Sequence, residues 1–155
     1  MNAAIVSRSP EDTAAIAAAL APLLRAGDAV ALTGDLAAGK TTFVQGLVKA
    51  LGGAETATSP TFSIAQFYET PRMQVLHVDA YRLDGPAAFR DLGLDRYADD
   101  VLMLIEWGDI VESEFPELLQ IGFAVAAEDQ RNLSLAFRGA RWTERAEQME
   151  RALCR

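Results

Sequence analysis

The stretch Gly34-Asp35-Leu36-Ala37-Ala38-Gly39-Lys40-Thr41 fits the pattern Gly-x-x-x-x-Gly-Lys-Ser/Thr in full. It lies between a short apolar run, residues 28–33, and a segment typical of a helix, residues 41–51. In such a strand–loop–helix unit, glycines let the backbone curl until successive N–H groups point at phosphate oxygens. The positive N-terminal end of the helix dipole also attracts the phosphate. A chance match in a chain of this length occurs roughly once in a few hundred sequences at ordinary residue frequencies. The stretch therefore predicts a phosphate-binding loop.

The last two residues of this loop have separate expected roles. Lys40 would reach the β- and γ-phosphates of a nucleotide, and the hydroxyl of Thr41 would bind Mg²⁺. A GTP-binding protein ordinarily carries Asn-Lys-x-Asp to read guanine and Asp-x-x-Gly as a switch, and neither pattern occurs in the sequence. ATP is therefore favoured over GTP.

Two acidic residues follow apolar runs and are candidates for the metal site. Asp79 follows residues 75–78, and Glu106 follows residues 101–105. Ligands of parallel sheets bind at the carboxyl ends of the strands, and Mg²⁺ prefers oxygen ligands. Either carboxylate could bind the metal, directly or through water, or orient an attacking water. The alternative is an acid that ends a strand and faces solvent.

Other residues leave two interpretations open. Ser59-Pro60-Thr61 could close on the metal or the γ-phosphate as a switch loop does, or could be a turn stiffened by proline. His77, the only histidine, lies in an apolar run, which favours a packed core residue over a catalytic base. Trp107 could lie near the nucleotide or in the core. Arg82 could approach the phosphates as an internal arginine finger, or could pair with a nearby acid.

The pattern around the loop predicts an α/β sheet with some antiparallel strands, in a single domain over residues 1–155. Ser9, Pro10 and Asp12 are typical of a helix start. The run 101–106 is the most apolar, so we expect it near the centre of the sheet. Strands are expected over 2–7, 28–33, 62–68, 73–79, 101–106, 121–126 and 132–137. Helices are expected over 9–24, 41–51, 86–92 and 142–153.

Composition and net charge limit the partners and the cellular compartment that we expect for the protein. The net charge is −8 and the pI is about 4.6, so we do not expect the chain to hold a nucleic acid alone, because such binding depends on a basic face. No apolar run approaches the roughly 20 residues that span a bilayer, so no membrane association is expected. A single cysteine, Cys154, fits a reducing cytoplasm.

Four motifs together resemble the TsaE (YjeE) family, bacterial ATPases for threonylcarbamoyladenosine (t6A) formation in tRNA. They are Gly34–Thr42, Ser59-Pro60-Thr61-Phe62, His77-Val78-Asp79-Ala80-Tyr81-Arg82-Leu83 and Ile105-Glu106-Trp107. The resemblance spans nearly the whole chain. It implies a P-loop NTPase-like three-layer α/β fold with a mixed, mostly parallel central sheet. It also implies weak ATP hydrolysis with Mg²⁺, in a complex with the TsaB and TsaD subunits that holds the tRNA.

The resemblance also implies roles for individual residues. The catalytic residues would be Lys40, Asp79 and Glu106, with Asp79 as a Walker-B-like acid. The metal ligands would be Thr41, Glu106 and Asp79. Asp12 and Thr13 would border the adenine, and Thr61 would belong to a switch-like loop. The full set expected to contact the nucleotide is Asp12, Thr13, Gly34, Asp35, Leu36, Ala37, Ala38, Gly39, Lys40, Thr41, Thr42, Thr61 and Trp107.

Within the loop, the chain departs from the family pattern at Ala37, where the family usually has glycine. Alanine resists a positive φ, so we expect a stiffer or slightly reshaped loop. Two other functions stay open. A small-molecule P-loop kinase would need a lid, for which residues 84–100 are available although they are acidic. A nucleotide-sensing binding module would bind ATP without turnover.

Overall fold

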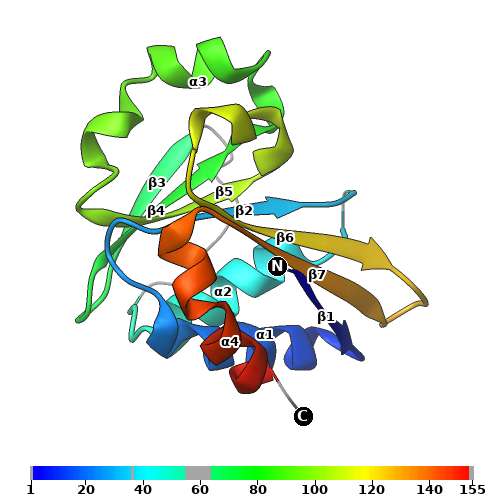
Figure 1. Ribbon diagram of the computed structural model, residues 1–155. Helices are drawn as coiled ribbons and strands as arrows, with labels where there is room; N and C mark the ends of the chain where they lie inside the picture. Colours follow the sequence, from blue (N-terminus) through cyan, green and yellow to red (C-terminus); the bar gives the residue numbers. More distant parts are fainter. Residues whose placement is uncertain (1, 36, 55–63, 154–155) are drawn as a thin grey trace.

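The computed structural model describes residues 2–35, 37–54 and 64–153, and in these ranges seven strands form one sheet (Figure 1). The strands are β1 (Asn2–Ser7), β2 (Ala29–Thr33), β3 (Ala65–Glu69), β4 (Gln74–Asp79), β5 (Val101–Glu106), β6 (Leu118–Val125) and β7 (Arg131–Arg138). Their order across the sheet is β1-β7-β6-β2-β5-β4-β3. The α-helices are α1 (Pro10–Leu20), α2 (Lys40–Ala50), α3 (Pro86–Asp91) and α4 (Ala140–Leu153).

The sheet is mixed but has one dominant strand direction. Strand β2 pairs in parallel with both β5 and β6, and β5 pairs in parallel with β4. The strands β3 and β7 run the opposite way, and β1, which is antiparallel to β7, shares the direction of the parallel group. This arrangement confirms the expected mixed, mostly parallel sheet.

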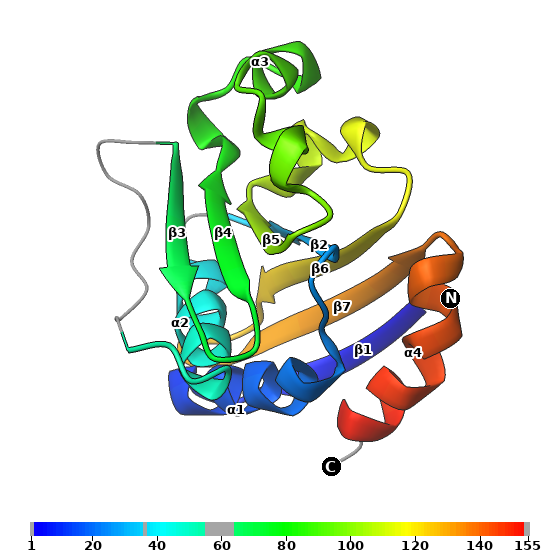
Figure 2. The same ribbon diagram turned by 90° about the vertical axis from the view of Figure 1, so that its left-hand side faces the viewer.

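Helices cover both faces of the sheet, which gives three layers (Figures 1 and 2). Helices α1, α2 and α4 lie on one face, and α3 lies on the other with several short 3₁₀ turns. Side chains of β5 alternate between two apolar clusters: Leu102 and Leu104 pack on the first face, and Met103 and Ile105 on the second. Because both faces are covered, every residue of β5 is buried, as its apolar sequence indicated.

Most element boundaries agree with the sequence prediction to within a few residues. Ser9 caps α1 as expected, since its Oγ accepts the N–H of Asp12 at 3.0 Å. Helix α1 ends at Leu20, before the expected end at residue 24, and a 3₁₀ turn follows (Ala21–Leu23). Pro22 explains this early end, because it has no N–H to donate within an α-helix. None of the helices in the described ranges is long and apolar enough to cross a membrane.

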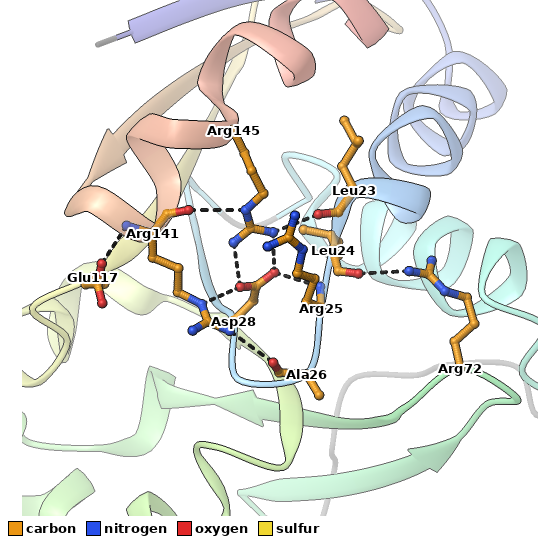
Figure 3. A network of polar contacts seen from close by, with 9 residues as sticks. All are labelled: Leu23, Leu24, Arg25, Ala26, Asp28, Arg72, Glu117, Arg141 and Arg145. Carbon is orange, nitrogen blue, oxygen red and sulfur yellow. Dashed lines mark hydrogen bonds and ion pairs between the residues drawn. The ribbon is translucent and has the colours of Figure 1, made fainter.

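A buried carboxylate joins the last helix to the turn before β2 (Figure 3). The guanidinium of Arg145 binds both oxygens of Asp28, at 2.6 and 2.8 Å, and Arg141 Nε donates to Oδ1 at 2.7 Å. The backbone N–H of Arg25 donates to Oδ2 at 2.7 Å, and Arg145 also reaches the carbonyl of Leu23. The side chain of Asp28 is inaccessible to solvent, so these bonds replace its hydration. They fix α4 against the start of the central strands.

The same contacts set the protonation behaviour of Asp28. Burial alone raises the pKa of this carboxyl, but hydrogen bonds from Arg145, Arg141 and the Arg25 N–H outweigh burial and hold the pKa below its ordinary value. A carboxyl group whose pKa is lowered by folding stabilises the folded state at pH values above its pKa in the unfolded chain, which is about 3.9 for Asp. That stabilisation is lost as the pH falls through the folded pKa.

We expect Asp28→Asn to lower the free energy of unfolding by about 3–5 kcal/mol, because it leaves Arg145 buried without its counter-charge. Urea denaturation at neutral pH measures the change. Asp95→Asn, which alters an exposed carboxylate, is the control and should change stability by no more than about 0.5 kcal/mol. The wild-type protein should also lose stability below about pH 3.9, and part of that loss should be missing from Asp28→Asn. Equal free energies of unfolding for Asp28→Asn and Asp95→Asn at neutral pH would contradict the structural role of Asp28.

Candidate functional site

The loop between β2 and α2 contains two glycines in conformations that other residues rarely adopt. Gly34 has φ of 137° and Gly39, the N-cap of α2, has φ of 108°. A Cβ atom at Gly34 would lie 2.4 Å from the carbonyl oxygen of Phe123. Both glycines of the motif are therefore required by backbone geometry, and the second directs the loop into the start of the helix.

Ala37 also has a positive φ, 62°, although it is not glycine. The loop therefore keeps the left-handed conformation at this position, and alanine carries the steric cost. The carbonyl of Ala37 accepts a hydrogen bond from Arg131 Nη2 at 3.3 Å, and Arg131 Nη1 donates to three carbonyls of the β6–β7 turn. Arg131 thus ties the loop to the neighbouring hairpin, a contact that the sequence did not indicate. Leu36, another expected nucleotide contact, lies outside the described residues.

Lys40 lies at the first residue of α2 with its ammonium group inside the curve of the loop. Its Nζ donates to the carbonyls of Gly34 and Asp35, at 2.5 and 2.9 Å, and lies 4.0 Å from the centre of the Trp107 ring. Burial lowers the pKa of Lys40, and nearby carboxylates, Glu106 foremost, oppose that shift without cancelling it. The lysine is therefore held where the motif places it, partly desolvated and beside an aromatic ring.

The two candidate acids lie side by side. Asp79 and Glu106 are partners in the parallel register of β4 and β5, which confirms that the two strand ends meet. Glu106 is buried, and its Oε1 accepts the hydroxyl of Thr41 at 3.0 Å. Asp79 is partly exposed, and its Oδ1 accepts the N–H of Tyr81 at 3.0 Å.

His77 is fully buried, as expected for a core histidine, but it also contacts the site. Its Nε2 lies 2.6 Å from Oε2 of Glu106. The register explains this contact: His77 pairs with Leu104, so its side chain leaves β4 on the same face as that of Glu106. The apolar sequence around His77 indicated burial, whereas the contact depends on the pairing of two strands that are distant in sequence.

A cleft of about 500 Å³ brings most of the expected residues together. Its lining consists of Ala37, Ala38, Gly39, Lys40, Thr41, Thr42, Asp79, Tyr81, Glu106 and Trp107. Tyr81 was not among the expected site residues; its ring lies 5.0 Å from that of Trp107, and more than half of its surface is exposed.

A smaller hollow of about 160 Å³ adjoins the cleft, and the two share Ala37, Gly39 and Thr42. Thr13 lines this hollow, as do Ser9, Pro10, Asp129 and Arg131. Asp12 lines neither space; its carboxylate accepts the N–H of Arg8 at 3.0 Å. Thr61 lies outside the described residues, so its expected role stays a prediction.

The side chains in the cleft fit Mg²⁺ together with a polyphosphate. The Thr41 hydroxyl and the Glu106 carboxylate are adjacent hard oxygen donors, and Asp79 lies beside them. Mg²⁺ is usually held by one or two carboxylates together with phosphate oxygens and water. The start of α2, with Lys40 at its first residue, supplies the positive charge that phosphates require.

A glycine loop between a parallel strand and a helix, with lysine and threonine at the helix start, defines a P-loop NTPase-like α/β protein. Residues 7–133 match the family model described as "Threonylcarbamoyl adenosine biosynthesis protein TsaE". The chain belongs to the TsaE family, which confirms the resemblance seen in its motifs.

Individual relatives agree with the family model. The chain is 37% identical over 145 residues to the tRNA threonylcarbamoyladenosine biosynthesis protein TsaE of Bacillus subtilis, covering 92% of this chain and 90% of the relative. It is 42% identical over 134 residues to the TsaE of Treponema pallidum, covering 84% and 98%. Its fold is similar to the crystal structure of Bacillus subtilis YdiB, with a TM-score of 0.81 and 33% identity over 97% of this chain and 95% of that one.

We expect Ala37→Gly to raise the free energy of unfolding by about 0.5–1 kcal/mol, because relief of the left-handed strain exceeds the extra chain entropy of glycine. Urea denaturation measures this gain. Ala38→Gly is the matched control: Ala38 is buried and has no positive φ, so this variant should be less stable than the wild type. A loss of stability in both variants would show that alanine at position 37 is not strained.

Proposed function

We propose that this protein, a single P-loop ATPase domain over residues 1–155, binds Mg·ATP and hydrolyses it weakly in support of t6A formation in tRNA. The observation that carries the proposal is the convergence of Lys40, Thr41 and Glu106 at the start of α2, beside the loop. Membership of the TsaE family supports the link to tRNA modification. The cytoplasm, where tRNA is modified, is the proposed location.

Each residue has a physical role in this proposal. Lys40 exchanges its contacts with loop carbonyls for phosphate oxygens, and the loop N–H groups hold the remaining negative charge. Thr41 and Glu106 hold Mg²⁺, which neutralises charge that develops on the phosphates during hydrolysis. Asp79, next to Glu106, would be a further oxygen donor to Mg²⁺ or would orient the attacking water. Trp107 and Tyr81, whose ring centres are 5.0 Å apart, form one wall of the cleft.

The acidic surface favours an accessory role. With a net charge of −8, the chain repels the phosphate backbone of tRNA, so we propose that partner subunits hold the RNA. We propose TsaB and TsaD as these partners, and tRNA contacts this subunit only indirectly. The kinase alternative gains no support from the cleft, since none of its lining residues comes from the segment 84–100. That segment packs through Phe89 onto the opposite face of the sheet.

Lys40→Ala should weaken Mg·ATP binding by roughly 10- to 100-fold, since one charge-assisted contact to phosphate contributes about 1.5–3 kcal/mol. Isothermal titration calorimetry measures the affinity. The only other lysine, Lys49, is exposed near the end of α2 and provides the matched control Lys49→Ala, which should bind as the wild type does. Absence of saturable Mg·ATP binding by folded wild-type protein would refute the proposed function.

ATP hydrolysis should be slow for the purified protein and at least several-fold faster after TsaB and TsaD are added together. Phosphate release under saturating ATP measures both rates, and Lys40→Ala with the same partners is the control for contaminating activity. Equal rates with and without partners would contradict the accessory role. Tight binding with no turnover under either condition would favour a nucleotide-sensing module, and transfer of phosphate to a small metabolite would favour a kinase.

A further inference from the structure

We propose that His77 is a positioning residue for Glu106: its Nε2–H group holds one carboxylate oxygen so that the other faces Thr41 and the metal. This inference rests on the proposed function, because it concerns how the chain prepares its own ligand for Mg²⁺. It differs from the role of a catalytic base, since His77 is fully buried and lies behind Glu106 as viewed from the cleft.

The two oxygens of Glu106 have different partners. Oε2 lies 2.6 Å from Nε2 of His77, and Oε1 lies 3.0 Å from the hydroxyl of Thr41. Both His77 and Glu106 are buried, and they leave neighbouring strands on the same face of the sheet. The carboxylate is therefore held at one oxygen by a rigid ring, and its remaining oxygen lies beside the first turn of α2.

The position of the histidine proton follows from its neighbours. An ionised carboxylate can only accept hydrogen bonds, so Nε2 of His77 carries the hydrogen that points at Glu106. The other ring nitrogen, Nδ1, is buried and has no hydrogen-bond partner in the described part of the chain. A hydrogen on Nδ1 would be left buried without an acceptor, which is costly, so we assign the donated hydrogen to Nε2, where Glu106 accepts it. The ring of Tyr68 lies 6.1 Å from the imidazole, between centres, and packs beside it.

A donor behind a metal-binding carboxylate has a measurable effect. It prevents rotation of the carboxylate and prepares the geometry that the metal needs, and removal of such a partner typically lowers metal affinity by about 10- to 100-fold. A packing role alone would not require nitrogen at this position, because an apolar side chain would fill the same space. The prediction therefore concerns the metal-dependent part of nucleotide binding.

Two amide substitutions separate the donor from the packing. In glutamine the side-chain nitrogen is as many bonds from Cα as Nε2 of histidine, so His77→Gln keeps a donor toward Glu106. In asparagine the nitrogen corresponds to Nδ1, so His77→Asn removes that donor. Calorimetry gives the ATP affinity of each protein in saturating Mg²⁺ and in EDTA. The factor by which Mg²⁺ raises ATP affinity should be at least 10-fold smaller for His77→Asn than for the wild type. The ATP affinity of His77→Asn in EDTA should stay within about twofold of wild type.

His77→Gln should keep the gain from Mg²⁺ to within about threefold of wild type. If His77→Asn does not fold, as judged by its thermal transition, His77→Met replaces it, because methionine fills the space flexibly and donates no hydrogen bond. If Mg²⁺ raises the ATP affinity of the wild type and of the variant without a donor by the same factor, this inference is overturned but the proposed function is not. Equal losses in Mg²⁺ and in EDTA would also overturn it, since they indicate a structural role. Wild-type protein that binds no Mg·ATP would overturn the proposed function and this inference with it.

Discussion

The parallel pairing of β5 with both β2 and β4 is the constraint on which the rest of the molecule depends. This pairing makes Glu106 a neighbour of Leu32, near the end of β2, and of Asp79, at the end of β4. The glycine loop leaves β2 at this same edge, so its lysine and threonine meet the carboxylates without any long connection. The pairing itself depends on helices that bury both faces of β5. The apolar core and the polar site are thus two results of one strand arrangement.

At the opposite ends of these strands, buried ion pairs add to the apolar packing that holds α4. Asp28 lies just before β2 and binds two arginines of α4, which is the last helix of the chain. A buried carboxylate of this kind adds little net stability compared with an apolar substitute, but it specifies one arrangement because each of its bonds needs a defined partner. The ion pairs therefore specify the position of α4 together with the apolar contacts that Trp142, Ala146 and Met149 make in the core.

Much of the fold could be predicted from local sequence. The glycine motif identified the loop and its flanking elements, and the apolar run 101–106 identified a strand buried on both faces, because each signal lies within a few neighbouring residues. The meeting of Asp79 with Glu106 was also predictable, since parallel strands end at a common edge. Three contacts were not predictable: that of His77 with Glu106, that of Arg131 with Ala37, and that of Arg145 with Asp28. Each joins residues that are 29 or more positions apart, and only the strand order and helix packing bring them together.

The contacts of Lys40 have a consequence for how tightly any anion can be held. Because the ammonium group already has two carbonyl partners and an aromatic ring, an incoming phosphate replaces existing bonds and gains only the difference in free energy. Under the proposed function, the loop would therefore favour anions that carry several charges. A single weakly charged group gains little from the replacement, whereas a chain of several phosphates can compensate through the backbone amides as well. Under the proposed function, a partner that moves Trp107 or the loop carbonyls away from the lysine would strengthen nucleotide binding without contacting the nucleotide.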